Sequence, residues 1–386
     1  EVRGELPIAT LADEIETEGE GQIRALVTIA GNPALSGPNA DRLARAFEGL
    51  SFMVSVDPYL NETTRHADVI LPPPSALERS HYDVAFATLS VRNVANYSPA
   101  ILEATGPSEA DILCRLALIA SGQGPDSDPG LVQQMLVRGL IDREIGNDRS
   151  LISGRDPEEI SAAVADRPAA EALLDVLIRT GPYGDGFGKN PDGLTLEQIE
   201  AKPHGVDLGA LEPALPDVLT TASSQLELFP DAIANDLARL RADLASAVDP
   251  NEIRLIGRRT VRSNNSWMHN VEVLVRGKDR CTLQISPNDA ERIGLVDGGR
   301  ARVTSRVGSV EVPIEITDEI RVGVVSLPHG YGHDQQGSGL NVAAKMPGVN
   351  SNRLTDDLPI DPLSGNAVLN GIPVAVESAG DNTTAS

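Results

Sequence analysis

The sequence predicts an α/β protein in which a parallel strand–helix–strand block is followed by a closed β-barrel. Near the N-terminus, short apolar runs alternate with a segment of helical periodicity. Beyond residue 250, many short strand-like runs are separated by tight turns and one short helix, a pattern that favours a barrel over a sandwich. The length of 386 residues exceeds one ordinary core, so we expect two or three domains.

Three strands and two helices are expected in the first block. Residues 23–30, 52–56 and 67–71 are short, apolar and partly β-branched runs. After the first run, Asn39 can cap a helix whose apolar side chains share one face. A helix between such strands implies a parallel, right-handed βαβ unit. A second helix, over residues 108–121, closes the block.

Four residues stand where the first two strands end, namely Gly31, Asn32 and Pro33 after one and Asp57 after the other. Parallel sheets bind ligands at the carboxyl ends of their strands. Glycine lets the backbone approach a ligand closely, and an aspartate can accept two hydrogen bonds from the N1–H and N2–H₂ edge of a guanine. The competing interpretation is that both segments are only turns, and composition alone favours it.

The remaining elements fall in two regions. Residues 122–250 are less regular, with helical periodicity over 158–165, 169–179 and 235–247 between glycine-rich segments typical of surface loops. Beyond them a short helix is expected to begin at Ser286-Pro287, where the proline suits the first helical position. The strands of the last region are expected over residues 253–256, 271–275, 282–285, 301–304, 310–316 and 323–327.

A second candidate ligand-binding segment directly follows the first strand of this last region. It combines arginine, asparagine, serine and histidine with the only tryptophan of the chain. Guanidinium and amide groups suit phosphates and the edges of a pterin, whereas a merely solvated loop does not explain why so many donors occur together. The candidate residues are Gly257, Arg258, Ser263, Asn264, Asn265, Ser266, Trp267 and His269.

Bulk properties exclude several classes of protein. The net charge of −24 makes nucleic acid and anionic membranes poor partners, and no run reaches the roughly 18 apolar residues of a membrane helix. Cys114 and Cys281 are too few for an iron–sulfur or cysteine-rich zinc site. No signal peptide follows Glu1, and we expect the natural N-terminus to lie upstream. A reducing, cytoplasmic compartment is the expectation.

Other chemistries fit the sequence less well. His329 and His333 are four apart, as in some zinc sites, but Gly330 and Gly332 oppose the helix which that geometry needs. A Ser/His/Asp hydrolase would lack its Gly-x-Ser-x-Gly elbow. No Gly-x-Gly-x-x-Gly or Gly-Lys-Ser/Thr phosphate loop supports an unrelated nucleotide enzyme.

Taken in order, these motifs resemble the dimethyl sulfoxide reductase superfamily, which includes formate dehydrogenases, nitrate reductases and polysulfide reductases. Gly31-Asn32-Pro33, residues 55–59, Glu62-Thr63, residues 67–72 and Glu78-Arg79 are similar to its third domain. The stretches 255–258, 352–355 and 371–374 resemble its dinucleotide-binding barrel domain. The resemblance implies a partial Rossmann-like domain (1–130), a connecting region (131–250), a six-stranded, double-psi-like barrel (251–379) and a frayed tail (380–386).

The resemblance also implies a cofactor, bis-molybdopterin guanine dinucleotide carrying molybdenum or tungsten. Asn32 and Asp57 would contact a guanosine, and the segment from Gly257 to His269 would contact pterin and phosphates. The segment 262–267 departs from the histidine-rich version of well-known formate dehydrogenases. Further cofactor contacts are expected from Arg79, Glu109, Asp111, Asn352 and Asn370, the last standing where many relatives have a lysine.

The family's iron–sulfur motif and its metal-ligating residue lie upstream of these domains, and neither is present in this sequence. We therefore expect no catalytic residue and no metal ligand here, and no turnover by this part alone, because the cofactor carries the chemistry. The resemblance predicts part of a formate dehydrogenase-like oxidoreductase that acts on a small substrate. A 4Fe–4S cluster would lie in the missing half, and an electron-transfer subunit is an expected partner. The alternative is a non-catalytic cofactor-binding or assembly module.

Overall fold

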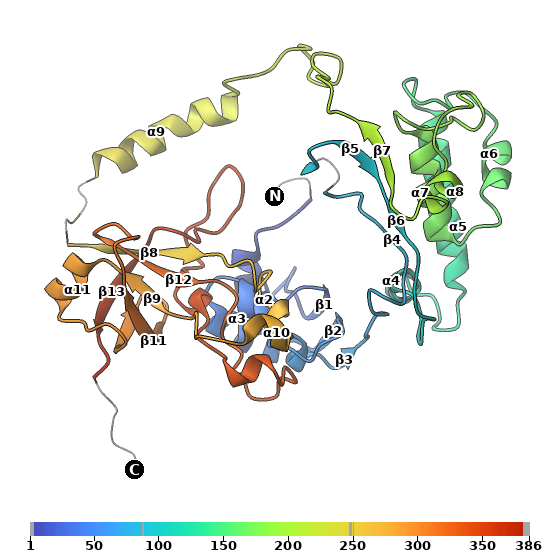
Figure 1. Cartoon of the computed structure of the whole chain (residues 1–386). Helices are drawn as coiled ribbons and strands as arrows, with labels where there is room; N and C mark the ends of the chain where they lie inside the picture. Colours follow the sequence, from blue (N-terminus) through green and yellow to red (C-terminus); the bar gives the residue numbers. More distant parts are fainter. Residues whose placement is uncertain (1–3, 87–88, 247–248, 250, 381–386) are drawn as a thin grey trace. The chain divides into compact units, whose positions relative to one another are not determined.

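The computed structural model describes residues 4–86, 89–246, 249 and 251–380, and the chain divides into two compact units (Figure 1). Unit 1 combines Glu1–Pro72 with Glu227–Ser386, and unit 2 is Pro73–Leu226. The predicted domain boundaries at residues 130, 250 and 379 stay predictions, since compactness alone does not test them. The expected frayed tail beyond residue 380 lies outside the described residues.

The first part of unit 1 is a three-stranded parallel sheet. Strands β1 (Ala25–Ile29), β2 (Phe52–Val56) and β3 (Val69–Ile70) lie in that order, with Ala25 opposite Phe52 and Val54 opposite Val69. The amphipathic helix α3 (Ala40–Glu48) connects β1 to β2. Its Leu43 and Phe47 pack with Met53 of β2 and Ile15 of α1 (Leu11–Glu16), so the predicted parallel βαβ unit is confirmed. The short helix α2 (Pro33–Ser36) begins directly after β1.

The second part of unit 1 is a closed, six-stranded barrel in the order β10-β11-β9-β12-β8-β13. The predicted β-barrel is thereby confirmed. Its core holds fully buried side chains from several strands, among them Leu283, Ile285 and Leu327. The helix α11 (Pro287–Ile293) is capped by Ser286, as predicted. The strands are β8 (Ile253–Arg258), β9 (Leu283–Ile285), β10 (Arg300–Thr304), β11 (Ser309–Ile316), β12 (Val324–Pro328) and β13 (Ile372–Ser378).

One predicted barrel strand is wrong. Residues 271–275 form the short helix α10 (Glu272–Val275), and Val273 is largely exposed. The sixth strand is instead β13, which pairs with β8 and β10 and closes the barrel. The apolar run at 271–275 resembled a strand, whereas Pro373 inside β13 weakened the strand pattern of the true one.

Unit 2 is mainly helical. Its core gathers Ile141, Ile152, Ile160 and Val176, and side-chain caps start four of its helices. The helices are α4 (Glu109–Ala120), α5 (Pro129–Ile145), α6 (Pro157–Ala163), α7 (Ala169–Thr180) and α8 (Leu196–Glu200). Two small ribbons pair β4 (His81–Tyr82) with β6 (Tyr97–Ser98), and β5 (Asn93–Ala95) with β7 (Val206–Gly209). The helices predicted over 108–121, 158–165 and 169–179 are confirmed as α4, α6 and α7.

The helix predicted over 235–247 is α9 (Asp231–Ala245), which lies in unit 1 and buries none of its residues. Its predicted last residue falls outside the described residues. Within the part of the chain that the structure describes, no helix has the length and apolar character to cross a membrane.

Candidate functional site

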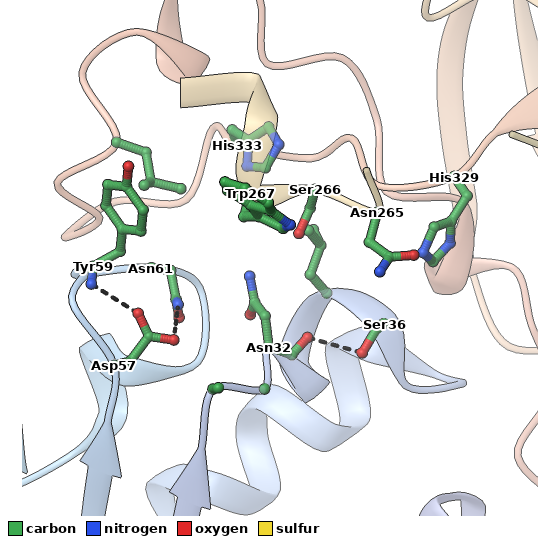
Figure 2. Close-up of a pocket in the computed structure, with 14 residues that line it drawn as sticks. Asn32, Ser36, Asp57, Tyr59, Asn61, Asn265, Ser266, Trp267, His329 and His333 are labelled. Atoms are coloured by element: carbon green, nitrogen blue, oxygen red, sulfur yellow. Dashed lines mark hydrogen bonds between the residues drawn. The ribbon is translucent and has the colours of Figure 1, made fainter. Parts of the chain in front are cut away.

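A pocket of about 340 Å³ lies in unit 1 between the strand ends of the parallel sheet and two loops of the barrel region (Figure 2). Gly31, Asn32 and Asp57 line it from the sheet side. The barrel side contributes Asn265, Ser266, Trp267, His329 and His333. The structure therefore brings together six residues of the two candidate segments, although more than 200 positions of sequence separate those segments.

On the sheet side, Asp57 is held in place by its own loop. Its carboxylate accepts hydrogen bonds from the Tyr59 backbone N–H at 2.7 Å and from Nδ2 of Asn61 at 3.3 Å (Figure 2). Burial raises the pKa of Asp57 above its usual value, and these two hydrogen bonds only partly offset that effect. Each carboxylate oxygen can accept a further hydrogen bond, so the side chain keeps acceptor capacity for a ligand.

Asn32 anchors the other strand end. Its side chain does not cap the helix α2 that follows. Instead, its Nδ2 donates to Glu62 at 2.8 Å, and its Oδ1 accepts from the Thr63 hydroxyl at 2.7 Å. One amide hydrogen of Asn32 remains available, since an NH₂ group carries two donors. Pro33 occupies the first position of α2 and does not line the pocket.

On the barrel side, the wall depends on two tightly packed loops. Asn264 and Asn265 both have positive φ, at 37° and 62°. Gly330 packs against this turn with φ of 91°, and a Cβ added there would lie 1.8 Å from the Asn265 carbonyl oxygen. Only glycine fits such an approach. Trp267 remains 52% exposed, which leaves its indole free to contact a ligand.

A second cavity of about 170 Å³ adjoins the barrel and shares His329 with the first. Gly257, Asn352 and Asn370 line it, together with Arg259. Asn370 accepts a hydrogen bond from the Gly257 backbone N–H at 2.8 Å. Asn352 is buried and donates to the Leu35 carbonyl at 2.9 Å, which ties the barrel region to α2.

Several predicted residues line neither cavity. The Arg258 guanidinium donates into the barrel, to the carbonyls of Ser326 and Thr282, and burial lowers its pKa. Ser263 is buried and donates to the Thr260 carbonyl. Asn264 takes part in the turn described above, and His269 lies behind the pocket wall.

The remaining three predicted residues belong to unit 2, whose described residues line neither cavity. Arg79 forms an ion pair with Glu109 at 2.8 Å. Asp111 accepts from the Ser108 hydroxyl and from the amide of Gln133. These side chains therefore bond to other residues of unit 2 and do not line a common pocket.

Sequence reasoning missed a buried polar cluster behind the pocket. Glu62 accepts from Asn32 and contacts Nδ1 of His333 at 2.9 Å, and Nε2 of His333 contacts Nδ1 of His269 at 2.9 Å. The pattern His329-x-x-x-His333 was the available signal, but it was weighed only as a zinc motif. Among the described residues, no group of three His, Cys, Asp or Glu side chains is placed to hold a metal ion.

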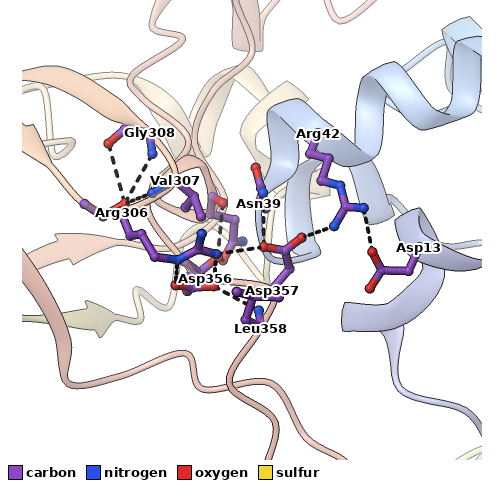
Figure 3. A network of polar contacts seen from close by, with 12 residues as sticks. Asp13, Asn39, Arg42, Arg306, Val307, Gly308, Asp356, Asp357 and Leu358 are labelled. Carbon is purple, nitrogen blue, oxygen red and sulfur yellow. Dashed lines mark hydrogen bonds and ion pairs between the residues drawn. The ribbon is translucent and has the colours of Figure 1, made fainter. Parts of the chain in front are cut away.

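A polar network joins the two parts of unit 1 (Figure 3). Arg42 of α3 pairs with Asp13, Glu16 and Asp357, at 2.5, 2.6 and 2.7 Å. Asp357 lies in the barrel region, where Arg306 also reaches it at 3.5 Å. Burial alone would raise the pKa of Asp357, but the hydrogen bonds from Arg42 and Asn39 hold it below its usual value.

The pocket offers a set of donors and acceptors suited to a purine nucleotide. Asp57 supplies an acceptor, whereas Asn32, Trp267 and the Asn265–Ser266 segment supply N–H and O–H donors. Its volume falls in the range of small-molecule sites, and an exposed indole beside it can stack on a base.

Comparison with known proteins gives an independent view. Residues 253–373 match the family described as "Molydopterin dinucleotide binding domain". The chain is 25% identical over 349 residues to "Probable oxidoreductase YoaE" of Bacillus subtilis, covering 88% of this chain and 43% of that protein. It is 23% identical over 354 residues to "Trimethylamine-N-oxide reductase" of Haemophilus influenzae, covering 85% and 39%.

Among solved structures, acetylene hydratase from Pelobacter acetylenicus has a similar fold, with a TM-score of 0.56 at 17% sequence identity. That match covers 96% of this chain and 46% of the other. The chain therefore spans less than half the length of these relatives.

Proposed function

The chain belongs to the molybdopterin oxidoreductase superfamily, and we propose that its pocket in unit 1 holds the guanine dinucleotide part of the cofactor. The observation that carries the proposal is the position of Asp57. Its carboxylate stands at a strand end, lines the pocket and keeps acceptor capacity. A guanine presents two adjacent donors to such a carboxylate, whereas an adenine does not.

The other pocket residues complete this assignment. Asn32 has one free amide hydrogen for the nucleoside, and Trp267 offers a stacking surface. Asn265, Ser266 and His329 face the same space and suit the phosphates, and Gly257, Asn352 and Asn370 of the adjoining cavity suit the remainder of the cofactor. When bound, the cofactor's metal centre supplies the redox chemistry of the complete enzyme.

We further propose the more specific role that the resemblance implies. In it, the complete protein is formate dehydrogenase-like and carries a bis-molybdopterin guanine dinucleotide with molybdenum or tungsten. It passes electrons between a small substrate and iron–sulfur relays. The metal ligand and the 4Fe–4S cluster would come from sequence outside this chain, which accords with the length of its relatives. This chain alone would bind the cofactor but would not turn over a substrate.

The proposed base recognition is tested with a matched pair of ligands, GDP-glucose and ADP-glucose, which differ only in the base. Trp267 is the only tryptophan of the chain and lines the pocket, so its fluorescence reports binding there. We expect GDP-glucose to bind about tenfold or more tightly than ADP-glucose, as one or two charge-assisted hydrogen bonds would give. We expect Asp57→Asn to remove that preference.

Asp318→Asn serves as the matched control, because Asp318 is exposed and lines neither cavity. It should keep the wild-type ratio of the two dissociation constants. Equal affinity of the wild type for the two ligands, or no binding of either, would overturn the proposed function.

A further inference from the structure

Three side chains behind the pocket form one continuous buried chain of hydrogen bonds. Glu62, His333 and His269 are 2%, 1% and 4% exposed. Oε1 of Glu62 lies 2.9 Å from Nδ1 of His333, and Nε2 of His333 lies 2.9 Å from Nδ1 of His269. Oε2 of Glu62 accepts from Asn32. The chain therefore begins at a pocket residue, passes through the ring of His333 in the pocket wall (Figure 2) and ends at His269.

The number of hydrogens shared by Glu62, His333 and His269 follows from which of their atoms donate and which accept. Burial alone would raise the pKa of Glu62, but the hydrogen bonds from His333 and Asn32 outweigh it and hold the pKa below its usual value. Glu62 is therefore a carboxylate that only accepts, so Nδ1 of His333 carries a hydrogen. The contact between the two imidazoles needs one further hydrogen, which either ring can carry.

The two positions of that shared hydrogen differ in what they allow. If it sits on Nδ1 of His269, then Nε2 of His333 accepts and both rings are neutral. A proton that enters at Nε2 of His269 lets the shared hydrogen pass to Nε2 of His333. The result is a neutral His269 and a His333 imidazolium between Glu62 and the pocket. One proton is taken from solvent, no other bond changes, and the new charge appears in the pocket wall.

The surroundings disfavour a proton that stays on His269 itself. Burial, together with the neighbouring His333, lowers the pKa of His269 to about 4. Tyr331 packs against its ring at 4.2 Å between centroids, and His329 adds a smaller unfavourable effect. Glu62 and the Gly330 backbone act in the opposite direction. A small cavity on the far side of His269 is lined by Arg262, Lys278, Asp279 and Arg280, three cations against one carboxylate.

From this geometry we propose that binding of a pyrophosphate ligand in the pocket is coupled to the uptake of one proton by the Glu62–His333–His269 chain. The inference rests on the proposed function, because it takes the nucleotide pyrophosphate as the ligand. An anion beside His333 stabilises the imidazolium form, since opposite charges a few ångströms apart in a partly buried site attract strongly. The coupling makes the affinity for the dinucleotide fall as the pH rises.

The test is isothermal titration calorimetry of the whole polypeptide with GDP-glucose. Its pyrophosphate is a diester and lacks the ionisation near pH 6 of a terminal phosphate, so the ligand itself exchanges no protons there. Titration in two buffers of different ionisation enthalpy, at about pH 6.5, gives the number of protons exchanged. We expect an uptake of about 0.5–1 proton per ligand and a dissociation constant that rises by up to about tenfold per pH unit.

Two variants locate the proton. His333→Gln removes the ring that holds the extra proton, and Glu62→Gln removes the charge that stabilises the imidazolium. Both should bind with no proton uptake and with an affinity independent of pH. His204→Gln, an exposed histidine of unit 2, should behave as the wild type. Glu62→Gln keeps the test decisive if His333→Gln does not fold.

The outcomes separate the two proposals. Binding of GDP-glucose without proton uptake, or uptake that survives in both variants, overturns the coupling and leaves the proposed function intact. Failure of the wild type to bind GDP-glucose overturns both.

Discussion

At the scale of single residues, the pocket depends on two side chains that carry charge and on one residue that has no side chain. Asp57 and Glu62 are the buried carboxylates, and each is kept in place by hydrogen bonds from its own loop or its neighbours. Gly330 contributes only its lack of a Cβ, which lets the loop of His329 and His333 approach the Asn264–Asn265 turn.

The requirement at Gly330 gives a prediction for Gly330→Ala. The added methyl group would meet the Asn265 carbonyl at 1.8 Å, so either loop must move. Gly337→Ala is the matched control, because Gly337 has nearly the same φ, at 90°, with no atom within 4 Å. We expect Gly330→Ala to lower the free energy of unfolding by about 1–3 kcal/mol more than the control. It should also weaken GDP-glucose binding. Equal urea midpoints for the two variants would contradict this view of the wall.

At the scale of elements, β12 connects the barrel core to the site. It pairs with β8 on one side and with β9 on the other, and His329 follows its last residue. Leu327 of β12 is fully buried in the core, so truncating it should disturb both the barrel and the loop beyond it.

Leu327→Ala should therefore destabilise unit 1 by about 2–5 kcal/mol, the usual cost of a leucine-sized cavity in a packed core. Leu358→Ala is the control, because Leu358 is 65% exposed. Chemical denaturation of both variants measures the difference. A loss below about 1 kcal/mol for Leu327→Ala would mean that the barrel core collapses around the cavity, against the tight packing inferred here.

The elements also show how far the sequence alone could lead. The parallel block was predictable because its helix and strands carry clear periodicity, as Leu43 and Phe47 illustrate. β13 was not predicted, because Pro373 interrupts its pattern and its partners β8 and β10 are distant in sequence. Gly31, Asn32 and Asp57 were predicted at the pocket from strand ends. The link between Glu62 and His333 depends on tertiary contacts that no local pattern records.

At the scale of the whole molecule, unit 1 is discontinuous, and the Arg42 network joins its two segments. Arg42→Ala would leave Asp357, whose side chain is 5% exposed, without its main partner. A buried carboxylate without its partner costs about 3–5 kcal/mol, and the partial exposure of Arg42 reduces this to roughly 2 kcal/mol. Arg302→Ala removes only exposed pairs, with Glu311 and Glu377, and should change stability by less than about 0.5 kcal/mol.

The folding stability of the Arg42→Ala variant should be less sensitive to acid than that of the wild type. The folded-state pKa of Asp357 is lowered, so its contribution to stability is present above the pKa of the unfolded chain. That contribution is lost as the pH falls through the folded-state pKa. Arg42→Ala removes the partner that lowers the pKa, so its unfolding free energy should fall less steeply between about pH 5 and pH 3. Parallel slopes for the variant and the wild type would show that the pair contributes nothing.

The discontinuous unit also sets an order of events during synthesis of the chain. Asn32 and Asp57 leave the ribosome before the barrel region, His333 follows roughly 300 residues after Asn32, and β13, which closes the barrel, comes later still. At usual rates of translation this interval lasts on the order of tens of seconds. Unit 2 is complete before the barrel begins. The sheet and α3 pack their apolar side chains within residues 11–67, so this part can form its own core first. Asn32 and Asp57 at its strand ends must then wait for the barrel loops that complete the pocket.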